Sequence, residues 1–542
     1  MSANTANIIV CVGVALLGAA LAYSFASSNS RQRRHPPGPY GYPFIGNIRV
    51  PADPAWKTYR QWSDVYESDI VRINVLGTNI VVTNTLQASS DLLDKKSAIY
   101  SDRPSYGMTM MTELCGFGWS IGLMRYNAFW RDARKAYHRE LHPQAVQRFR
   151  PIVVRSSYEL LRNLLRAPEK FNEHLRHAMG RELLYSAYGI DVQEKDDPII
   201  ATAEHGLESA VAAMNIGQFL VDLIPALKYV PEWFPGAGFQ RQAKIWKASL
   251  DSMLHVPFNA AKNLLAAGRL PDDCVAKALL TDTVPNAVDP AYMEDVVRAA
   301  LGTMYAAGMD TTFSALQSFF LAMVLYPKFQ QKAQAFIDRA CDGRLPDFSD
   351  YHSLPYVHAI LKEILRWNPV IPLNLVHVST EDDVYDGYDI PKGTFVLSNT
   401  WYINLASVSA WHDAYHFARA ILHDPAVYNA PDTFNPERFL RTNASGELEL
   451  DPAVRDPNEA TFGFGRRICP GRFLAYEALW LAVASVLAAF SIAKAKDEHG
   501  ADVTPDAEYE YGFMIFPKPF GCRIVPRSSE CESLVGATAE SE

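Results

Sequence analysis

The sequence predicts a mainly helical globular domain with small β-sheets, preceded by one membrane-spanning helix. Two long apolar runs, Met293–Leu325 and Phe473–Phe490, predict buried helices. The segment 71–83 is rich in β-branched residues and has a glycine near its centre, which predicts a short hairpin. A third apolar run, Ile8–Ala26, stands alone near the N-terminus and has about the length of a bilayer span.

The N-terminal run predicts a signal anchor. Ile8–Ala26 holds 19 residues without a charge, no Lys or Arg precedes it, and three arginines follow at 31, 33 and 34. Because positive charge tends to stay cytoplasmic, residues 1–7 should face the lumen and the bulk of the chain the cytosol. A cleaved signal peptide is the alternative, but it would need a basic region before a shorter apolar core. The basic and Pro-rich residues 27–47 predict a stiff hinge between anchor and domain.

The composition narrows the class of protein. The chain has 542 residues, 49% of them hydrophobic, which favours a globular rather than a disordered protein. A net charge of −9 argues against a nucleic-acid partner. The seven cysteines show no CxxC and no disulfide-type spacing, which favours a reducing compartment. Residues 527–542 are small and polar and predict a flexible tail.

A helix is predicted over 127–140, with a tryptophan and an arginine on one face. Trp130 and Arg134 are four positions apart, so their side chains lie on the same side of the helix. A surface cation–π pair would have the same spacing. Lys135 and Arg139 fit either a basic patch for an acidic redox partner or an ordinary solvated face.

The long helix expected over Met293–Leu325 contains the motif Ala307-Gly308-Met309-Asp310-Thr311-Thr312. A glycine inside a helix costs about 1 kcal/mol relative to alanine, so Gly308 needs a reason. A buried aspartate such as Asp310 needs a partner or a chemical role. The alternative is a bent or capped core helix in which the Thr311 hydroxyl bonds back to its own helix.

The stretch 462–471, Phe-Gly-Phe-Gly-Arg-Arg-Ile-Cys-Pro-Gly, sets one cysteine in a glycine-rich loop before the last apolar run. Glycines let the backbone turn tightly and approach a flat ligand. A thiolate is a strong axial ligand of haem iron, and an arginine two residues earlier can neutralise a haem propionate. The alternative is a structural cysteine in a Gly-rich loop. The stretch resembles the haem-binding signature of the cytochrome P450 family, through Phe462, Gly465, Arg467, Cys469 and Gly471.

The resemblance implies chemical roles for the motif in the long helix. In the family a small residue followed by glycine lets the helix open beside the haem, and here that glycine is Gly308. The threonine hydroxyl hydrogen-bonds the iron-bound oxygen, and the preceding acid helps deliver protons. These roles would belong to Thr311 and Asp310.

The resemblance also implies residues that surround the haem and the substrate. Trp130 and Arg134 would reach a haem propionate, and His377 lies at a position that often approaches one, although a plain loop histidine is the alternative. The substrate-pocket candidates are apolar residues at family positions that could equally be core residues: Met304, Met309, Ile371 and Phe513.

An ion triad is predicted to support the fold. Glu363 and Arg366 are three positions apart on one helix face, which suits an ion pair. Surface pairs at this spacing contribute little by themselves, so we expect a third partner. The segment 435–439 is similar to the family segment whose arginine joins the pair, which implies Arg438. The triad is assigned to fold and haem-pocket support.

The resemblance implies the cytochrome P450 fold, with one haem-thiolate catalytic domain over 48–526, haem b as cofactor, and a single-pass protein of the endoplasmic reticulum membrane. The reaction would be monooxygenation of an apolar small molecule by O2, with electrons from NADPH through NADPH-cytochrome P450 reductase. The general character of the sequence, including the segment after Trp401, resembles fungal P450s of secondary metabolism or xenobiotic turnover. The alternatives are a reductase-independent peroxide isomerase and an inactive haem-binding paralogue. Isomerases of that kind often lack the acid–Thr pair.

One segment departs from the family pattern. Family members usually run from the equivalent of Trp401 directly into a segment like Ala420-Ile421-Leu422-His423-Asp424-Pro425, but here 402–419 stands between. A surface insertion is one explanation, because loops tolerate added length. We favour a retained intron: the last base of the Trp codon with a Tyr codon gives GTA, and an Arg codon can begin AG. Excision would join Trp401 to Ala420 in frame, and transcript sequencing decides between the two.

Overall fold

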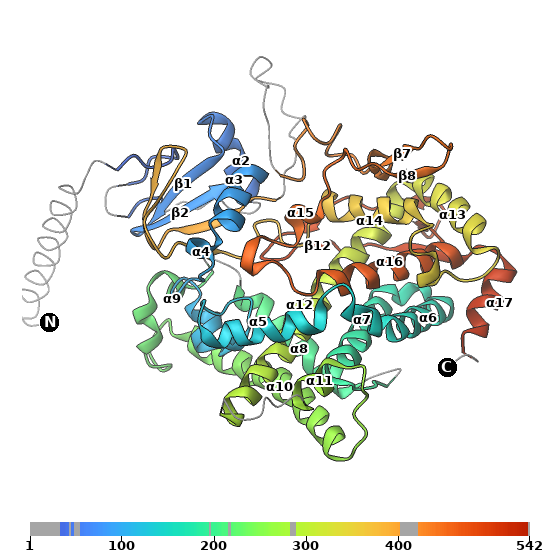
Figure 1. Ribbon diagram of the computed structural model, residues 1–542, viewed down its shortest axis with the longest axis horizontal. Helices are drawn as coiled ribbons and strands as arrows, with labels where there is room; N and C mark the ends of the chain where they lie inside the picture. The colour runs from blue at the N-terminus through green and yellow to red at the C-terminus, as the bar shows by residue number, and fades with distance from the viewer. Residues whose placement is uncertain are drawn as a thin grey trace, which may run out of the picture.

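The computed structural model describes residues 33–42, 45–47, 55–193, 197–214, 218–281, 289–400 and 421–539. They form a mainly helical body with small sheets, and the largest sheet lies at one side of it (Figure 1). The helices are α2 (Ala55–Val65), α3 (Leu86–Ser90), α4 (Ser97–Tyr100), α5 (Ala128–Leu141), α6 (Arg150–Arg166), α7 (Phe171–Tyr188), α8 (Pro198–Met214), α9 (Leu220–Leu223), α10 (Gly238–Ala266), α11 (Val275–Thr281), α12 (Pro290–Leu325), α13 (Pro327–Cys341), α14 (Pro355–Trp367), α15 (Asn458–Thr461), α16 (Arg472–Ala489) and α17 (Ser529–Ala537). The strands are β1 (Ile70–Val75), β2 (Thr78–Thr83), β3 (His377–Val378), β4 (Asp383–Tyr385), β5 (Tyr388–Ile390), β6 (Phe395–Ser398), β7 (Leu440–Thr442), β8 (Leu448–Leu450), β9 (Phe490–Lys496), β10 (Asp502–Val503), β11 (Tyr509–Glu510), β12 (Phe516–Pro517) and β13 (Cys522–Pro526).

The predicted long helix is confirmed as α12, which runs for 36 residues through the core. Asp289 caps its N-terminus by accepting a hydrogen bond from the Ala291 amide (3.0 Å), and Pro290 takes the first helical position. A Cβ at Gly302 would stand 2.6 Å from a Leu254 methyl, so this glycine lets α12 and α10 pack closely. The helix is buried on nearly all sides, as its apolar sequence predicted.

The predicted hairpin is confirmed as β1 and β2, which pair from Ile70–Thr83 to Val75–Thr78. The turn consists of Leu76 and Gly77, both with positive φ (49° and 88°), as a two-residue hairpin turn requires. The hairpin is one side of a four-stranded sheet of order β1-β2-β6-β3, in which β1 is an edge strand. A second sheet has the order β10-β9-β13.

The predicted membrane span, Ile8–Ala26, lies outside the described residues. Among the residues that are described, one helix is apolar and long enough to cross a bilayer, and it is α16. It has a mean hydropathy of 1.5, but 78% of it is buried inside the protein. Burial of this kind is typical of the core helix of a globular domain.

The expectation of a flexible tail over 527–542 is wrong for most of that range. Residues Ser529–Ala537 form α17, whose N-terminus is capped by the Ser528 hydroxyl. Val535 is buried against the core, and the Arg162 guanidinium donates to the Thr538 carbonyl (3.1 Å). The composition did not indicate this helix, because one N-cap and one buried valine are enough to form and dock it.

A buried carboxyl on α7 predicts that stability depends on pH. Burial raises the pKa of Glu182 from 4.5 to about 8. The native state therefore keeps a proton that the unfolded state has lost, and stability falls as pH rises from about 4.5 to about 8. We expect Glu182→Gln to raise the melting temperature at pH 8 by several degrees and to change it little near pH 4. The exposed Glu169→Gln should change neither value, and a wild-type-like melting temperature of Glu182→Gln at both pH values would refute the assignment.

Candidate functional site

The loop around Cys469 has a backbone path that only glycines permit. Gly463 and Gly465 both have positive φ (76° and 53°), and a Cβ at Gly465 would collide with the Leu93 carbonyl oxygen. The Cys469 amide donates to the Phe462 carbonyl (2.8 Å) and closes the loop on itself. The cysteine is thus held in one place directly before the first turn of α16.

The groups around Cys469 have opposing effects on the pKa of its thiol. Burial, the largest effect, raises the pKa of the thiol, while the Gly471 amide and the Arg134 and Arg472 guanidinium groups lower it. The N-terminus of α16 adds a positive dipole end near the sulfur. A bound metal ion would stabilise the thiolate directly.

Arg467 lies next to the cysteine and is buried. Its Nε donates to the Ser101 carbonyl (2.7 Å) and its Nη1 to the Ile121 carbonyl (3.2 Å), and its guanidinium stacks 4.2 Å above the Trp130 ring. Its Nη2 is buried and has no hydrogen-bond partner among the residues that the structure describes. Burial lowers the pKa of Arg467 to about 9. A buried donor without a partner points to an acceptor on a ligand.

Two further arginines converge on this place. Arg103 is buried and donates to the carbonyls of Gly122 (2.8 Å) and Val376 (2.6 Å). Arg134, on α5, donates to the Ile468 carbonyl. Burial lowers the pKa of Arg103, and the charges of Arg467 and Arg134 lower it further. The repulsion among these arginines would be relieved by an anionic ligand.

The α12 helix meets the same site from the other side. The Ile121 amide donates to the Thr303 hydroxyl on α12 (3.0 Å), and the Ile121 carbonyl is the one that Arg467 binds, so one loop residue joins the helix to the cysteine loop. Ala307, one turn beyond Thr303, is exposed although most of α12 is buried. The site therefore combines a held cysteine, buried arginines and an open helix face.

Comparison with known proteins identifies this combination. The sequence model described as "Cytochrome P450" matches residues 36–418 and 415–522. The chain belongs to the cytochrome P450 family. It is 40% identical over 504 residues to cytochrome P450 monooxygenase 98 of Postia placenta, covering 92% of each chain. It is 38% identical to cytochrome P450 monooxygenase COX2 of Coprinopsis cinerea (100% of this chain, 97% of the relative) and 38% identical to tryptamine 4-monooxygenase of Psilocybe cyanescens (95% and 98%).

The two matched stretches of the P450 model meet and overlap at residues 415–418, inside the predicted insertion, residues 402–419. This segment lies outside the described residues. The retained intron therefore stays a prediction.

The residues present fit a haem, the cofactor of the P450 family. The haem carries two propionates, and the partnerless Nη2 of Arg467 together with the buried guanidinium of Arg103 offers donors for them. Trp130 is buried beneath Arg467 and fixes the plane of its guanidinium. Cys469 would bind the iron.

Asp310 and Thr311, both on α12, each have a hydrogen-bond partner. Asp310 is 4% exposed, and its Oδ1 accepts from Arg176 Nη1 on α7 (3.1 Å). Burial raises the pKa of Asp310, while Arg176 opposes this shift. The Thr311 hydroxyl donates to the Ala307 carbonyl (2.8 Å), which is the back-bond considered from the sequence. α12 stays helical through the motif, so no opening is seen there.

Close packing of α12 against α7 explains why residue 308 is a glycine. A Cβ at this position would stand 2.9 Å from a Leu183 methyl on α7. The glycine thus brings α12 and α7 together and sets the distance from Arg176 to Asp310. The structure shows this contact in place of a helix that opens at Gly308.

The predicted ion triad is present, and His377 lies on β3 with its ring against a backbone carbonyl, so its approach to a propionate stays a prediction. His377 is buried beside Arg103, its Nδ1 lies 2.7 Å from the Tyr100 carbonyl, and burial lowers its pKa well below the usual value. Glu363 accepts from Arg366 Nε (2.7 Å) and from Arg438 Nε (3.1 Å). Glu363 and Arg366 are fully buried.

The pocket candidates separate into two groups. Met304 is 8% exposed, and Ile371 and Phe513 are partly buried at the edge of the main core. Met309 is fully buried, and its methyl group would lie 3.6 Å from a Cβ at Gly180 on α7. Met309 therefore packs between helices, because it lies on the α7 side of α12, and this argues against a place in the substrate pocket.

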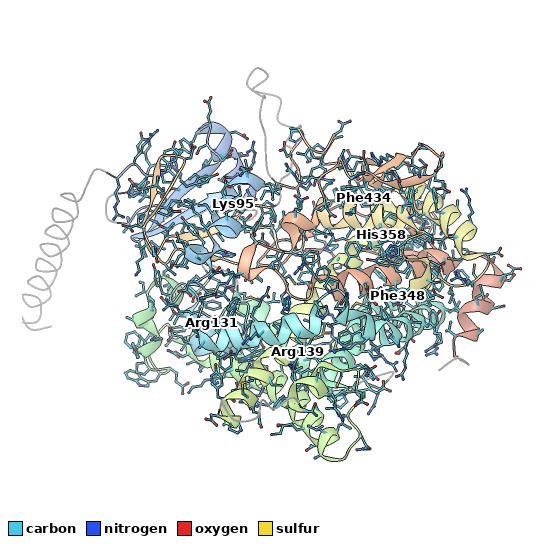
Figure 2. The ribbon with its side chains drawn as sticks, in the orientation of Figure 1. Lys95, Arg131, Arg139, Phe348, His358 and Phe434 are labelled. Carbon is cyan, nitrogen blue, oxygen red and sulfur yellow. The ribbon has the colours of Figure 1, made fainter. Side chains whose placement is uncertain are left out.

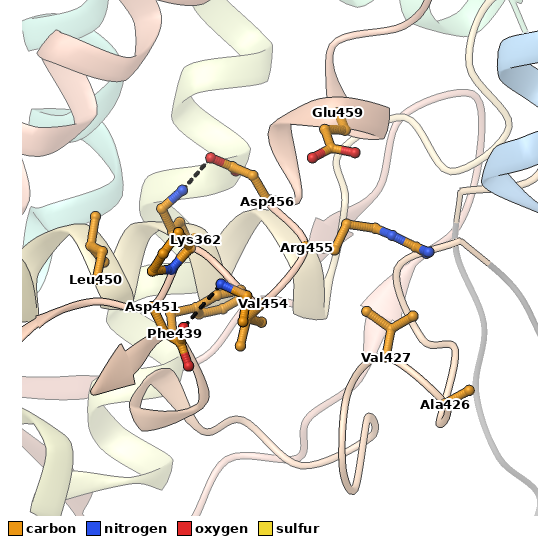
Figure 3. Close-up of a pocket in the computed structure, with 12 residues that line it drawn as sticks. Lys362, Ala426, Val427, Phe439, Leu450, Asp451, Val454, Arg455, Asp456 and Glu459 are labelled. Carbon is orange, nitrogen blue, oxygen red and sulfur yellow. Dashed lines mark hydrogen bonds and ion pairs between the residues drawn. The ribbon is translucent and has the colours of Figure 1, made fainter. Parts of the chain in front are cut away.

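A surface cavity of about 580 Å³ lies elsewhere, between α14, β8 and the loop 451–456. Figure 3 shows the Lys362–Asp456 ion pair at its wall. Its lining includes no residue of α12 or of the loop 462–471. We therefore do not assign substrate binding to it.

Sequence reasoning missed two site residues, Arg103 and Arg176. Arg103 stands in Ser101-Asp102-Arg103-Pro104, where a proline-terminated polar run precedes a loop-rich region. That signal is weak, because a surface turn has the same composition. Arg176 follows no pattern that separates it from other charged helix residues.

Proposed function

We propose that this P450 monooxygenase inserts one oxygen atom of O2 into an apolar small molecule and receives its electrons from NADPH through a membrane-bound reductase. The observation that carries this proposal is the buried Asp310, held by Arg176, directly before Thr311 on α12. A monooxygenase must deliver protons to the bound oxygen, and a buried acid next to a hydroxyl suits that task. Reductase-independent isomerases need no such delivery.

Each residue of the site has one task in this proposal. Arg467, Arg103 and Arg134 hold the propionate side of the haem, and Trp130 supports Arg467. Cys469 would bind the iron, and the haem would supply the oxygen activation. Asp310, whose pKa is raised by burial, holds a proton more readily than an exposed aspartate does.

Thr311 needs one rearrangement to take part. Its hydroxyl donates to the Ala307 carbonyl, so it must turn about χ1 to reach a ligand above the open face at Ala307. The pocket candidates Met304, Ile371 and Phe513 are apolar, and Ile371 and Phe513 are only partly buried. This supports an apolar small molecule, including a secondary metabolite or a xenobiotic, as substrate.

Exposed apolar residues support attachment to the endoplasmic reticulum membrane. Leu220 is 66% exposed, and Tyr229 and Trp233 are each 78% exposed. Figure 1 places α9 on the same side of the molecule as the β1–β2 hairpin, along which the first described residues lie. Large apolar patches of this kind are typical of interaction surfaces, including lipid surfaces.

A basic helix face supports docking of an acidic reductase. Arg131, Lys135 and Arg139 are exposed on α5, the helix that also carries Trp130. Figure 2 shows Arg131 and Arg139 along this helix. A cationic face near the haem would attract an electron-transfer partner of opposite charge.

The proposed proton delivery is tested by Asp310→Asn. We expect this change to lower product formation by about 10²-fold while NADPH consumption with the reductase continues and yields peroxide. The reason is that asparagine cannot give up a proton, whereas it can still accept the Arg176 hydrogen bond. The measurement is the ratio of product to NADPH consumed, with the CO-difference spectrum as a check on the haem.

The matched control is Asp295→Asn, which changes an exposed carboxyl near the N-terminal end of α12 itself. It should leave the ratio of product to NADPH unchanged. Substrate turnover by wild-type protein without any reductase or NADPH would favour the isomerase instead. Absence of turnover with an intact CO-difference spectrum, across a broad set of apolar ligands, would favour an inactive paralogue.

A further inference from the structure

Residues 33–42 and 45–47, here called the strap, lie along the sheet in place of the hinge expected from their prolines. The Arg72 amide on β1 donates to the Pro37 carbonyl (2.8 Å), and the Asn47 amide donates to the Asn74 carbonyl (2.5 Å). The Leu76 amide donates to the Ile45 carbonyl (3.1 Å). The strap therefore covers the edge strand β1, whose backbone groups would otherwise be unpaired.

Two glycines fix how closely the strap approaches β1. A Cβ at Gly38 would collide with the Arg72 carbonyl oxygen, and a Cβ at Gly46 would collide with the Asn74 carbonyl oxygen. Gly46 also has a positive φ of 68°. The strap is thus built for this position on the sheet, because larger residues would hold it away.

The start of the strap carries Arg33 and Arg34, and these lie on the β4–β5 hairpin. Arg33 Nη2 is 3.1 Å from Asp382 Oδ2. The Arg34 amide donates to Asp389 Oδ2 (2.7 Å), and the Asp389 amide donates back to the Arg34 carbonyl (2.7 Å). The Arg34 guanidinium lies 5.1 Å above the Tyr388 ring.

The hairpin is strongly acidic, which complements the basic segment. Five carboxylates occur within nine residues: Glu381, Asp382, Asp383, Asp386 and Asp389. Asp383 is already bound by Lys96 (2.8 Å) and by the Tyr100 hydroxyl (2.9 Å). Asp382 and Asp389 are the two that bind the strap.

The contacts differ in strength. The Arg33–Asp382 pair is exposed on both sides, at 39% and 64%, and such pairs contribute little alone. The reciprocal backbone contact between Arg34 and Asp389 fixes the chain direction, and the Tyr388 ring adds a cation–π contact. Together they hold the side chain of Arg33 and both backbone groups of Arg34.

We propose that the β4–β5 hairpin is an acidic docking site for the basic segment Arg33–Arg34, and that this docking holds the segment on the catalytic domain. The occupant is a segment of this chain, and its charge matches the hairpin. The competing partner for the two arginines is an anionic lipid headgroup. This proposal does not depend on the proposed substrate or electron donor.

Limited trypsin digestion of the full-length protein in vesicles of neutral phosphatidylcholine tests the docking. Trypsin needs an extended, released backbone at Arg33 or Arg34, so the docked strap should resist cleavage. We expect Asp382→Asn combined with Asp389→Ala to speed cleavage at these residues about tenfold, because local opening becomes easier. The amide oxygen introduced by Asp382→Asn can still accept the hydrogen bond from the Lys392 amide, which keeps the hairpin intact. Mass spectrometry of the released fragment locates the cut.

The matched control is Asp386→Asn, an exposed carboxyl at the turn of the same hairpin, where asparagine also tolerates the positive φ of 51°. It should not change the cleavage rate. Gly38→Ala should speed cleavage without any change to the hairpin, because it displaces the strap from β1. The CO-difference spectrum checks that each variant is folded.

Two outcomes would overturn the proposal. The first is equal cleavage rates in the wild type and the Asp382→Asn/Asp389→Ala variant. The second is protection of that variant that returns in vesicles containing phosphatidylserine, which would place the arginines on lipid headgroups.

Discussion

Replacing Cys469 with serine is expected to abolish the red-shifted Soret band of the CO-bound reduced protein and to leave no measurable monooxygenation. A serine hydroxyl is not ionised at neutral pH and cannot replace the thiolate that tunes the haem iron. The loop itself should persist, because its turns depend on Gly463 and Gly465 and on the Cys469 amide rather than on the side chain. The measurement is the CO-difference spectrum together with haem content per chain.

Cys531→Ser is the matched control, since Cys531 is partly buried on α17 and its thiol contacts the Ala488 carbonyl at the C-terminal end of α16, whereas Cys469 precedes the N-terminal end of that helix. Its spectrum should equal that of the wild type. A normal CO-difference band in Cys469→Ser would contradict the assignment of the iron ligand. Retained haem with an altered band would instead agree with the arginines and Trp130 holding the cofactor without the axial sulfur.

The features that the sequence predicted well are those with a local period or a local turn. The helix α12 was expected over Met293–Leu325 and spans Pro290–Leu325, because an apolar run of this length is too long for a strand and favours a helix. The hairpin β1–β2 follows from β-branched residues around a glycine. The glycine loop before Cys469 is equally local, so its signature can be read within ten residues.

The features that were missed depend on contacts between distant residues. Arg103 binds the carbonyls of residues 19 and 273 positions away, and Arg176 binds Asp310 134 positions away. No short pattern encodes such distances. The sequence could show that a buried Asp310 needed a partner, but the partner came from another helix.

The strap and α17 show a second limit of predicting structure from the sequence. The strap was assigned to a stiff hinge from its prolines, and α17 to a flexible tail from its small polar residues, since these compositions are typical of such segments. Yet the strap pairs with β1 through its backbone, and α17 docks through Val535 and Thr538. Backbone pairing and a single buried side chain hardly change the composition of a segment, so composition cannot predict them.

Replacing Glu363 with alanine is expected to destabilise the domain by about 3–5 kcal/mol, because two buried arginines would lose their shared carboxylate. Glu363 accepts from Arg366 through Nε and Nη2 (2.7 and 2.8 Å), from Arg438 Nε, and from the Asn435 amide (2.7 Å). It is fully buried, so water cannot take the place of these contacts. Thermal unfolding followed by far-UV circular dichroism, with haem content as a second readout, measures the loss.

The exposed carboxylate of Glu437 offers the matched control. It pairs with Lys332 at the surface, where its side chain is 39% exposed, so Glu437→Gln should cost no more than about 1 kcal/mol of unfolding free energy.

A second experiment replaces the whole triad, as Glu363→Leu with Arg366→Met and Arg438→Met. This variant should regain much of the stability that Glu363→Ala loses, because no unpaired charge remains buried. If Glu363→Ala unfolds at the wild-type temperature, the triad does not brace the fold. Arg366 and Arg438 also donate to the carbonyls of Leu422 and Thr433 (3.0 Å each). If the triple variant is no more stable than Glu363→Ala, the loss comes from these carbonyl contacts rather than from the arginine charges.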